Sequence, residues 1–396
     1  MHLKHEVTSI AAHGVVMVHV ENAAAGVPTY AVAWVVDDAG SIEPIGLQPV
    51  GDDGVAMFLL RHDKRYNVGA WSDTNGDKVY DGGEPAASVR DVQPLPLDTT
   101  SERAGPLPLR LDASNGLPAG QRFVVTDNES ELGDALAIHV GEVVSLDDPR
   151  FTVENGEMGM WRPFEFLQRF GVGIYFLGPY DPQKLPVIFV YGISGSPQDW
   201  RVMLESLDTT KVQPWFFHYP GGMRIERSAG ALVTGMLMLE QKLGFARLAV
   251  VAHSMGGLVS RGAIQRAAEQ AGSNFIPRFV SISTPWGGHE SAADGVRRLN
   301  YPVPSWRDMD PQSDYLRSIL SRPLPAGTQH DLIFSFKTTG GFGMPNDNDG
   351  TVGVASELVT SVQEQAHSVF GLPLGHAEIL TSPVTLRHVE AALRVP

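Results

Sequence analysis

Ser254 stands in the segment VVAHSMGGLVSR (residues 250–261), where a run of small and β-branched residues meets two glycines. The residues before Ser254 predict a buried strand, and the residues after it have helical spacing up to Gly272. A serine at a sharp strand-to-helix turn exposes its hydroxyl for attack on a carbonyl carbon. Ala252 takes a place where glycine is usual, and alanine is also small enough for strand and helix to pass closely. The alternative is a serine that only caps a helix.

A catalytic serine needs a base and an acid, and both have candidates later in the chain. The segment GLPLGHAEIL provides His376 beside a glycine, and NDNDG provides Asp347 and Asp349. We favour Asp349 as the acid, because Gly350 allows the loop to turn and to direct the carboxylate toward the imidazole. Asp347 is left to assist, to bind a cation or to have no role.

Three other histidines are weaker candidates for the base. His253 adjoins Ser254, and adjacent residues in a strand point to opposite faces. His367 lies beside an aliphatic patch, and His388 lies in a predicted terminal helix. Each of them is more simply explained as a solvated or core histidine, so His376 is the predicted base.

Stabilisation of a developing oxyanion needs two fixed backbone N–H groups. One is expected from Met255, which follows the serine. The other is expected from Ile193, in the loop YGISGSP that follows the apolar run LPVIFV. The alternative for this loop is an ordinary glycine turn. Its place at the end of the strand before the serine-bearing unit favours the oxyanion role.

The elements that must position these residues alternate between strands and helices over residues 185–396. Apolar strands are predicted in LPVIFVYG, RLAVVAHS, PRFVSISTP and DLIFSFKTT, and AGALVTGMLMLEQKLG is a helix with one apolar face. This alternation predicts βαβ units and a mostly parallel sheet. The segment GVGIYFLGPYD is expected to add an earlier strand of the same sheet.

Residues 10–115 instead look all-β, because GVVMVHV, TYAVAWVV, VAMFLL and RYNVGAW are short runs separated by turn residues. We predict a β-sandwich domain in residues 1–120 and an α/β domain in residues 185–396. Residues 121–184 are expected to connect them and to supply the first strands and helix of the second domain. The charge also differs, since residues 1–140 hold 20 acidic and 9 basic residues of a chain with net charge −15.

The composition of the 396-residue chain excludes several classes of protein. There is no cysteine, which excludes disulfides, cysteine-ligated metals and thiol catalysis. The acidic balance argues against a nucleic acid partner, because phosphate binding needs basic patches. No apolar run reaches the length of a membrane span, and the first residues have no signal-peptide core. We expect an extracytoplasmic protein whose signal segment is absent from this chain, and the oligomeric state is left open.

Five ordered segments together resemble the bacterial lipase/esterase branch of the α/β-hydrolases: VIFVYGISGSPQDW, VVAHSMGGLVSR, VSISTPWGG, NDGTVG and GHAEIL. The resemblance covers residues 185–396 and includes members with alanine two places before the serine. It implies an α/β-hydrolase fold with a catalytic triad and an oxyanion hole formed by Ser254, Asp349, His376, Ile193 and Met255. Tyr191 departs from the pattern, since many relatives have histidine there, but that position is structural.

The resemblance also places a cap or lid in residues 289–326, between TPWGG and DLIFSF. In similar lipases such a segment shapes the acyl pocket and can open at a lipid surface, so contact with lipid through the lid is one expectation. The candidate pocket or lid residues are Trp286, Tyr301, Val303, Trp306, Met309, Tyr315 and Leu316. For the residues of the insertion there is an equally favoured alternative. In it, these apolar side chains only pack the cap against the core of the domain.

A second chemistry is expected in the first domain. In DTNGDKVYDGGE, the EF-hand calcium spacing is met by Asp73, Asn75, Asp77, the carbonyl of Val79, Asp81 and Glu84. Lys78 occupies the position where glycine normally allows the sharp turn, and strands rather than helices flank the loop. We favour a structural calcium ion over the alternative, a solvated acidic hairpin tip.

Together these observations predict a two-domain serine ester hydrolase that needs no cofactor for catalysis and acts on a small-molecule or lipid ester. Three alternatives stay open. The same triad serves thioesterases, phospholipid or glycolipid deacylases and acyltransferases. The β-sandwich allows a protein that binds glycan or membrane with hydrolysis as a secondary activity. The last alternative is an inactive scaffold.

Overall fold

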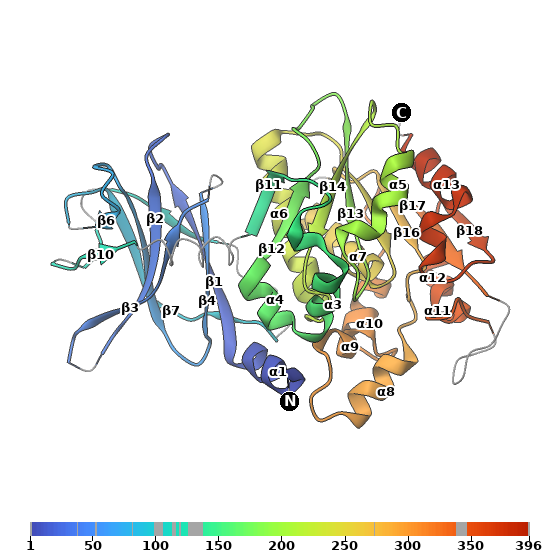
Figure 1. Cartoon of the computed structure of the whole chain (residues 1–396), viewed down its shortest axis with the longest axis horizontal. Helices are drawn as coiled ribbons and strands as arrows, with labels where there is room; N and C mark the ends of the chain where they lie inside the picture. The colour runs from blue at the N-terminus through green and yellow to red at the C-terminus, as the bar shows by residue number, and fades with distance from the viewer. Residues whose placement is uncertain are drawn as a thin grey trace. The chain divides into compact units, whose positions relative to one another are not determined.

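The computed structural model separates into two units, which are described one by one (Figure 1). The first unit contains residues 1–7, 139–166 and 172–396, and the second contains residues 8–138 and 167–171. The structure describes residues 2–37, 39–51, 54–80, 82–98, 106–112, 116–118, 120–125, 138–272, 274–337 and 347–394. Asp81, one of the predicted calcium ligands, lies outside the described residues.

The second unit consists mainly of β-strands, which follow the helix α1 (His2–Ala12). Its strands are β1 His13–Glu21, β2 Thr29–Val36, β3 Ile42–Pro49, β4 Val55–Arg61, β5 Tyr66–Ser72, β6 Val79–Tyr80, β7 Ala86–Val92, β8 Leu95–Pro96, β9 Leu107–Arg110 and β10 Phe123–Val124. One sheet has the antiparallel order β3-β2-β5-β7. In another sheet β1 lies between β4 and β8 and also pairs with β9. β6 and β10 form a separate two-stranded sheet.

Two clusters of buried side chains stabilise this unit. Alternate residues of β1, among them Val16 and Val18, share a core with Ala31 and Ala33 of β2, so the two sheets pack face to face. Because successive residues of a strand point to opposite faces, the intervening residues of β2 contribute to a second cluster. Its aromatic members are Tyr30, Trp34, Trp71, Tyr80 and Phe123. The predicted β-sandwich is confirmed.

The first unit contains an 8-stranded sheet with the order β11-β12-β14-β13-β15-β16-β17-β18. The strands are β11 Ile138–Val143, β12 Val172–Phe176, β13 Leu185–Val190, β14 Val212–His218, β15 Ala249–His253, β16 Arg278–Ile282, β17 Gln329–Ser335 and β18 Ser368–Leu372. β12 is antiparallel to β14, and all pairs from β14 to β18 are parallel. The predicted mostly parallel sheet of an α/β-hydrolase fold is confirmed.

Helices connect these strands and cover the sheet. They are η1 Pro149–Phe151, α3 Val153–Trp161, α4 Pro163–Phe170, η2 Pro197–Trp200, α5 Arg201–Ser206, α6 Ile225–Leu243, α7 Met255–Ala271, α8 Glu290–Arg298, α9 Pro304–Met309, α10 Asp314–Ser321, α11 Val354–Glu357, α12 Thr360–Gln363, η3 Glu378–Thr381 and α13 Pro383–Leu393. α7 ends at Gly272, whose φ of 66° provides the left-handed stop that the sequence predicts. Within the described part of the chain, no helix combines the length and the apolar composition of a membrane span.

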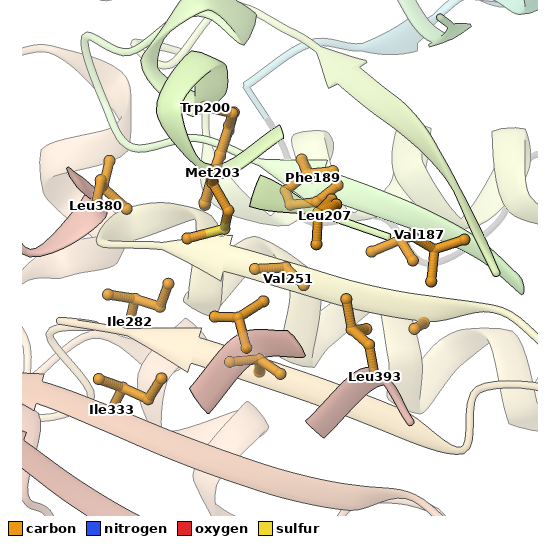
Figure 2. Close-up of a cluster of buried hydrophobic side chains, with 14 of the residues drawn as sticks. Val187, Phe189, Trp200, Met203, Leu207, Val251, Ile282, Ile333, Leu380 and Leu393 are labelled. Carbon is orange, nitrogen blue, oxygen red and sulfur yellow. The ribbon is translucent and has the colours of Figure 1, made fainter. Parts of the chain in front are cut away.

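Apolar side chains fix helices to both faces of this sheet. Figure 2 shows one face, where Phe189 of β13 and Val251 of β15 share a cluster with Leu393 of α13. The neighbouring strand residues point to the opposite face. There α6 and α7 pack on each other, and they also contact β12 and β15 respectively. Burial on both faces explains why the strands appear in the sequence as continuous apolar runs.

Candidate active site

Ser254 forms the turn between β15 and α7. Its backbone has φ 54° and ψ −131°, a conformation that residues other than glycine rarely adopt. Its N–H donates to the carbonyl oxygen of Ile282 at 2.8 Å, which ties the turn to the end of β16. The side chain makes no helix-capping hydrogen bond. The alternative of a serine that only caps a helix therefore does not describe this residue.

Small residues allow the close packing around this turn. Ala252 is completely buried and pairs with β13 on one side and β16 on the other. A Cβ atom on Gly256 would collide with the carbonyl oxygen of Val190. A Cβ atom on Gly192 would lie 3.0 Å from the Cβ of Ser254, so the loop after β13 lies directly against the serine. The demand for small residues, and not for glycine in particular, explains the alanine in the motif.

His376 connects Ser254 with Asp349. Its Nε2 atom lies 2.8 Å from Ser254 Oγ, and its Nδ1 atom lies 2.6 Å from Asp349 Oδ2. The backbone N–H of His376 also donates to the backbone carbonyl oxygen of Asp349 at 3.0 Å, so the two loops are joined by their backbones. The loops follow β18 and β17, and the serine follows β15. Carboxyl ends of parallel strands thus bring together three residues that are far apart in the sequence.

Asp349 is buried, with 2% of its surface exposed. Its Oδ1 atom accepts from the N–H groups of Thr351 (2.9 Å) and Val352 (2.7 Å), and Oδ2 accepts from the Ser335 hydroxyl (2.7 Å). Burial raises the pKa of the Asp349 carboxyl, but the hydrogen bonds from His376, Val352 and Ser335 outweigh this effect and lower the pKa to about 2. Asp349 is therefore an anion at neutral pH, with its orientation fixed by several donors.

The other aspartate of this loop, Asp347, lies outside the hydrogen-bonded chain. It is exposed, and its hydrogen bond among the described residues is through the backbone, where its carbonyl oxygen accepts from the N–H of Val354 at 3.0 Å. Gly350 has a φ of 98°, which gives the loop the turn expected after Asp349. The two carboxylates of NDNDG therefore have different environments, one exposed and one buried.

The position of His253 differs from the expectation. Strand alternation predicts that its side chain points away from Ser254, but its ring lies 4.7 Å from the ring of His376. Its Nε2 atom donates to the His376 carbonyl oxygen at 2.9 Å. Burial, and after it the charge of His376, lower the pKa of His253 to about 3, so its ring is neutral. Alternation fails here because Ser254 leaves the strand conformation, and His253 supports the loop that carries His376.

Both predicted oxyanion donors lie near the serine turn, since Met255 directly follows Ser254 and Ile193 follows Gly192, which lies against the serine. Met255 is the first residue of α7, where a backbone N–H has no partner within the helix. Ile193 lies in the loop after β13, which Gly195 closes through a hydrogen bond from its N–H to the Gly192 carbonyl at 3.2 Å. Among the described residues, neither N–H group has a hydrogen-bond partner. Both are available to a ligand.

Sequence reasoning missed a group of buried polar residues behind Asp349. The Ser335 hydroxyl, at the end of β17, lies 2.6 Å from the Ser283 hydroxyl, which follows β16. The Ser335 N–H donates to Glu357 Oε2 at 3.1 Å, and only 1% of Glu357 is exposed. The two serines follow apolar strand runs, which is where sites form in parallel sheets. Glu357 carries no comparable signal.

The insertion 289–326 forms α8, α9 and α10, and buried polar contacts fix it to the core. Asp308 of α9 is completely buried and accepts from the Arg224 guanidinium (2.7 Å) and from the N–H of Ile225 (2.7 Å). The Tyr315 hydroxyl donates to the carbonyl oxygen of Leu258 in α7 at 2.9 Å. These contacts attach α9 to the start of α6 and α10 to α7.

The predicted pocket or lid residues fall into two groups. Those that are buried are Trp286, Val303, Met309, Tyr315 and Leu316. Tyr301 and Trp306 are partly exposed, and the Trp306 ring meets that of Trp161 edge-on at 5.9 Å between centroids. Trp286 packs edge-on against Phe279 at 6.3 Å. Most of these side chains therefore contribute packing, and their role in a pocket or lid stays a prediction.

The predicted calcium loop lies between β5 and β7, in the other unit. Asp73 is buried, and its carboxylate accepts from the N–H groups of Gly76 (2.8 Å), Asp77 (3.1 Å) and Lys78 (3.0 Å). Lys78 has a φ of 60°, so it adopts the left-handed conformation that glycine normally provides at this position. Asn75 Oδ1 accepts from the N–H of Asp77 at 3.0 Å. The loop thus folds around its acidic side chains.

Glu84 lies at the other end of this loop. Its Oε1 atom accepts from the N–H of Thr74 at 2.7 Å, while Oε2 is buried without a hydrogen-bond partner among the described residues. Burial raises the pKa of Glu84, and the negative charge of Asp73 raises it further. The hydrogen bond from Thr74 lowers this pKa but does not cancel the two other effects. Val79 donates its N–H to Asp77 Oδ1 at 2.8 Å. In the described ranges, no three histidine, aspartate or glutamate side chains are grouped closely enough to hold a metal ion.

Residues 180–305 match a family described as "Putative serine esterase (DUF676)". This segment includes β13, the serine turn and β16, but not the loops of Asp349 and His376. No curated protein matches the sequence of this chain.

Several solved structures are similar over about half of the chain. Lipase BlEst2 from Bacillus licheniformis in its mature form is 18% identical over 56% of this chain and 98% of its own, with a TM-score of 0.45. The lin2722 gene product from Listeria innocua is 16% identical over 53% of this chain and 94% of its own, with a TM-score of 0.40. Naproxen esterase from Bacillus subtilis is 11% identical over 55% of this chain and 86% of its own, with a TM-score of 0.34.

Proposed function

This chain is an α/β-hydrolase and a carboxylic ester hydrolase, and we propose that Ser254, His376 and Asp349 are its catalytic triad. One observation carries the proposal: His376 lies 2.8 Å from the Ser254 hydroxyl through one ring nitrogen and 2.6 Å from Asp349 through the other. This is the arrangement that activates a serine nucleophile. The strained backbone of Ser254 supports the same role, because strain of this kind concentrates at active sites.

In the proposed reaction, Ser254 Oγ attacks the carbonyl carbon of the ester while His376 Nε2 takes its proton. The tetrahedral intermediate collapses, and the alcohol leaves with the proton that His376 returns. Water then attacks the acyl-serine with the same base, and the carboxylic acid is released. Asp349 accepts the Nδ1–H of His376 throughout, so it keeps the imidazole in the correct tautomer and stabilises its charged form.

Ile193 and Met255 are the proposed donors to the oxyanion of the intermediate. Their N–H groups lack partners among the described residues, and Met255 also stands at the positive end of the α7 dipole. The loop of Ile193 lies against the serine through Gly192. Donors fixed in advance stabilise the developing negative charge without the cost of reorienting solvent.

The test is hydrolysis of p-nitrophenyl esters with acyl chains of about two to sixteen carbons, combined with fluorophosphonate labelling and mass spectrometry. We expect ester hydrolysis and a label on the peptide that contains Ser254. The chain-length preference then distinguishes an esterase from a lipase. Labelling without hydrolysis of any oxygen ester would indicate a thioester or another acyl donor as the substrate. A protein that neither reacts with the probe nor cleaves esters contradicts the proposal.

We also propose that the loop from Asp73 to Glu84 binds Ca²⁺ and that the ion stabilises the β-sandwich. Oxygen ligands stand at the EF-hand positions, and Lys78 takes the backbone conformation that this loop requires. Glu84, the last of these ligands, has a buried carboxylate oxygen with no donor among the described residues. A cation would satisfy this oxygen and reduce the repulsion between Glu84 and Asp73.

Calcium is therefore expected to raise the melting temperature (Tm) of the chelated protein. A ligand at about 100 times its Kd adds about 2.7 kcal/mol to the free energy of unfolding, which corresponds to several degrees. Ester hydrolysis at low temperature should survive chelation, because no triad residue belongs to the loop. Glu84→Gln is the matched control, since it keeps an acceptor for Thr74 but removes the charge. Isothermal titration that gives no heat at millimolar calcium contradicts the site.

A further inference from the structure

Glu357 ends the short helix α11 and points its carboxyl group into the interior. Its Oε2 atom accepts the N–H of Ser335 at 3.1 Å, whereas Oε1 has no hydrogen-bond donor among the described residues. Only 1% of the residue is exposed, so water does not compensate for the missing donor. A carboxyl oxygen in this position is satisfied if it carries a proton and donates a hydrogen bond itself.

Two side chains near Glu357 can accept such a hydrogen bond, the Ser283 hydroxyl and the Asp349 carboxylate, and the charged carboxylate is the stronger acceptor. Ser335 holds both carboxyl groups, because its N–H donates to Glu357 Oε2 at 3.1 Å and its hydroxyl donates to Asp349 Oδ2 at 2.7 Å. Two ionised carboxylates held by one residue repel each other strongly in a buried site. Asp349 is the one that stays ionised, because backbone N–H groups, the Ser335 hydroxyl and His376 all donate to it. Burial, and after it the charge of Asp349, raise the pKa of Glu357 to about 9.

We propose that neutral Glu357 is a positioning residue for the triad, which donates its carboxyl proton in a hydrogen bond to the Asp349 carboxylate. The inference rests on the proposed function, in which Asp349 orients His376. The bond from Glu357 adds a donor to Asp349 beside the Ser335 hydroxyl. It fixes the plane of the carboxylate, so that Oδ2 stays aligned with His376 Nδ1 while the imidazole gains and loses charge.

Among the described residues, the groups that act on the Glu357 carboxyl include no cation, and the Lys337 ammonium lies instead beside Gly375, next to His376. The groups against its carboxyl are Asp349, the Ser283 hydroxyl and the Ser335 N–H. Beyond Asp349 lie two histidines, His376 and His289, of which His289 binds the Thr351 carbonyl oxygen at 2.8 Å. Burial lowers the pKa of His289, so this ring is neutral at the pH of the reaction. Neutralisation of Glu357 by its own proton is therefore the consistent arrangement.

The experiment compares Glu357→Gln with Glu357→Met in the full chain. Glutamine keeps a donor toward Asp349 and an acceptor for the Ser335 N–H, while methionine has a similar volume but neither function. We expect kcat per fluorophosphonate-titrated site to stay within about threefold in Glu357→Gln and to fall about tenfold or more in Glu357→Met, with little change in KM, because a hydrogen bond to a charged group is lost. Equal kcat in the two variants overturns the positioning role.

The pH dependence of stability tests the proton separately. Because the pKa of Glu357 is raised in the folded state, the folded protein holds a proton that the unfolded chain releases above about pH 4.5. The Tm of the wild type should therefore fall relative to that of Glu357→Gln as pH rises from about 4.5 to 9. Parallel Tm curves would show that Glu357 is not protonated and would overturn the inference.

Failure of the proposed function gives a different result. If the wild type neither hydrolyses esters nor takes the fluorophosphonate label, the triad proposal fails, and the role of Glu357 in positioning fails with it. The Tm comparison is independent of activity and still reports the proton. If the wild type is active and the Gln and Met variants have the same kcat, the triad proposal stands. The inference about Glu357 is then the one that is wrong.

Discussion

Replacing Ser254 with alanine is expected to lower kcat/KM for an ester substrate by about 10⁴-fold or more, because the attacking oxygen is removed. The loss should appear in kcat, since the acyl pocket and the oxyanion donors remain in place. The measurement is steady-state hydrolysis of the best p-nitrophenyl ester from the chain-length series. Fluorophosphonate labelling of the variant should disappear as well, because the probe needs the same nucleophile.

The fold of Ser254→Ala should not change, and this provides the control. Alanine meets the positive φ of 54° at a cost similar to that of serine, and the N–H of residue 254 can still donate to Ile282. Thermal unfolding and circular dichroism should therefore match the wild type. A variant that unfolds like the wild type and keeps more than about a tenth of its activity would place the nucleophile elsewhere in the chain.

The triad could be predicted from the sequence because each member stands beside a local signal. Ser254 follows a buried strand and precedes two glycines, Gly350 marks the turn after Asp349, and a glycine also precedes His376. Strand ends in a parallel sheet meet at one edge, so the order of the motifs along the chain is enough to bring the three side chains together. The distances that make them a hydrogen-bonded chain needed the structure.

Glu357 and Ser335 could not be predicted in the same way, because their importance depends on packing in three dimensions. Glu357 occupies the last position of a four-residue helix, and nothing in VASE indicates that its carboxyl is buried against Asp349. Ser335 looks like one polar residue in the apolar strand LIFSF. As predicted, His253 is not the base that contacts Ser254, but the direction of its side chain was misjudged, since a period-2 rule cannot anticipate the break in strand geometry at residue 254.

Some strands could be predicted from their local sequence, whereas others depend on the neighbouring strands of the sheet. β2 appears in the sequence with the bounds that the structure has, because TYAVAWVV is apolar on both faces and ends at turn residues. β3 and β14 escaped prediction, and both contain proline, which argues against a strand. These prolines are Pro44 and Pro49 in β3 and Pro214 in β14. β3 tolerates proline because it is at the edge of its sheet. In β14 the neighbouring strands override the local preference.

Asp349→Asn should reduce kcat by about 10⁴-fold, a loss close to that of the serine variant. Asparagine has nearly the same shape, but its amide group donates to His376 Nδ1 at the position where the carboxylate accepts. The imidazole is then held in the tautomer with the proton on Nε2, so it cannot take the proton from Ser254. Steady-state kinetics gives the loss, and the double variant with Ser254→Ala should be no slower than Ser254→Ala alone, because the residues act as a unit.

Asp347→Asn is the matched control, since it makes the same change of atoms in the same loop, at an exposed aspartate outside the hydrogen-bonded chain. We expect it to keep kcat within about twofold of the wild type. If Asp347→Asn were the damaging change and Asp349→Asn were not, the assignment of the acid would be reversed. That result would also remove the basis for Glu357, because a carboxylate that does not orient His376 needs no second donor behind it. The two aspartates of NDNDG therefore test the triad and its buried support in one comparison.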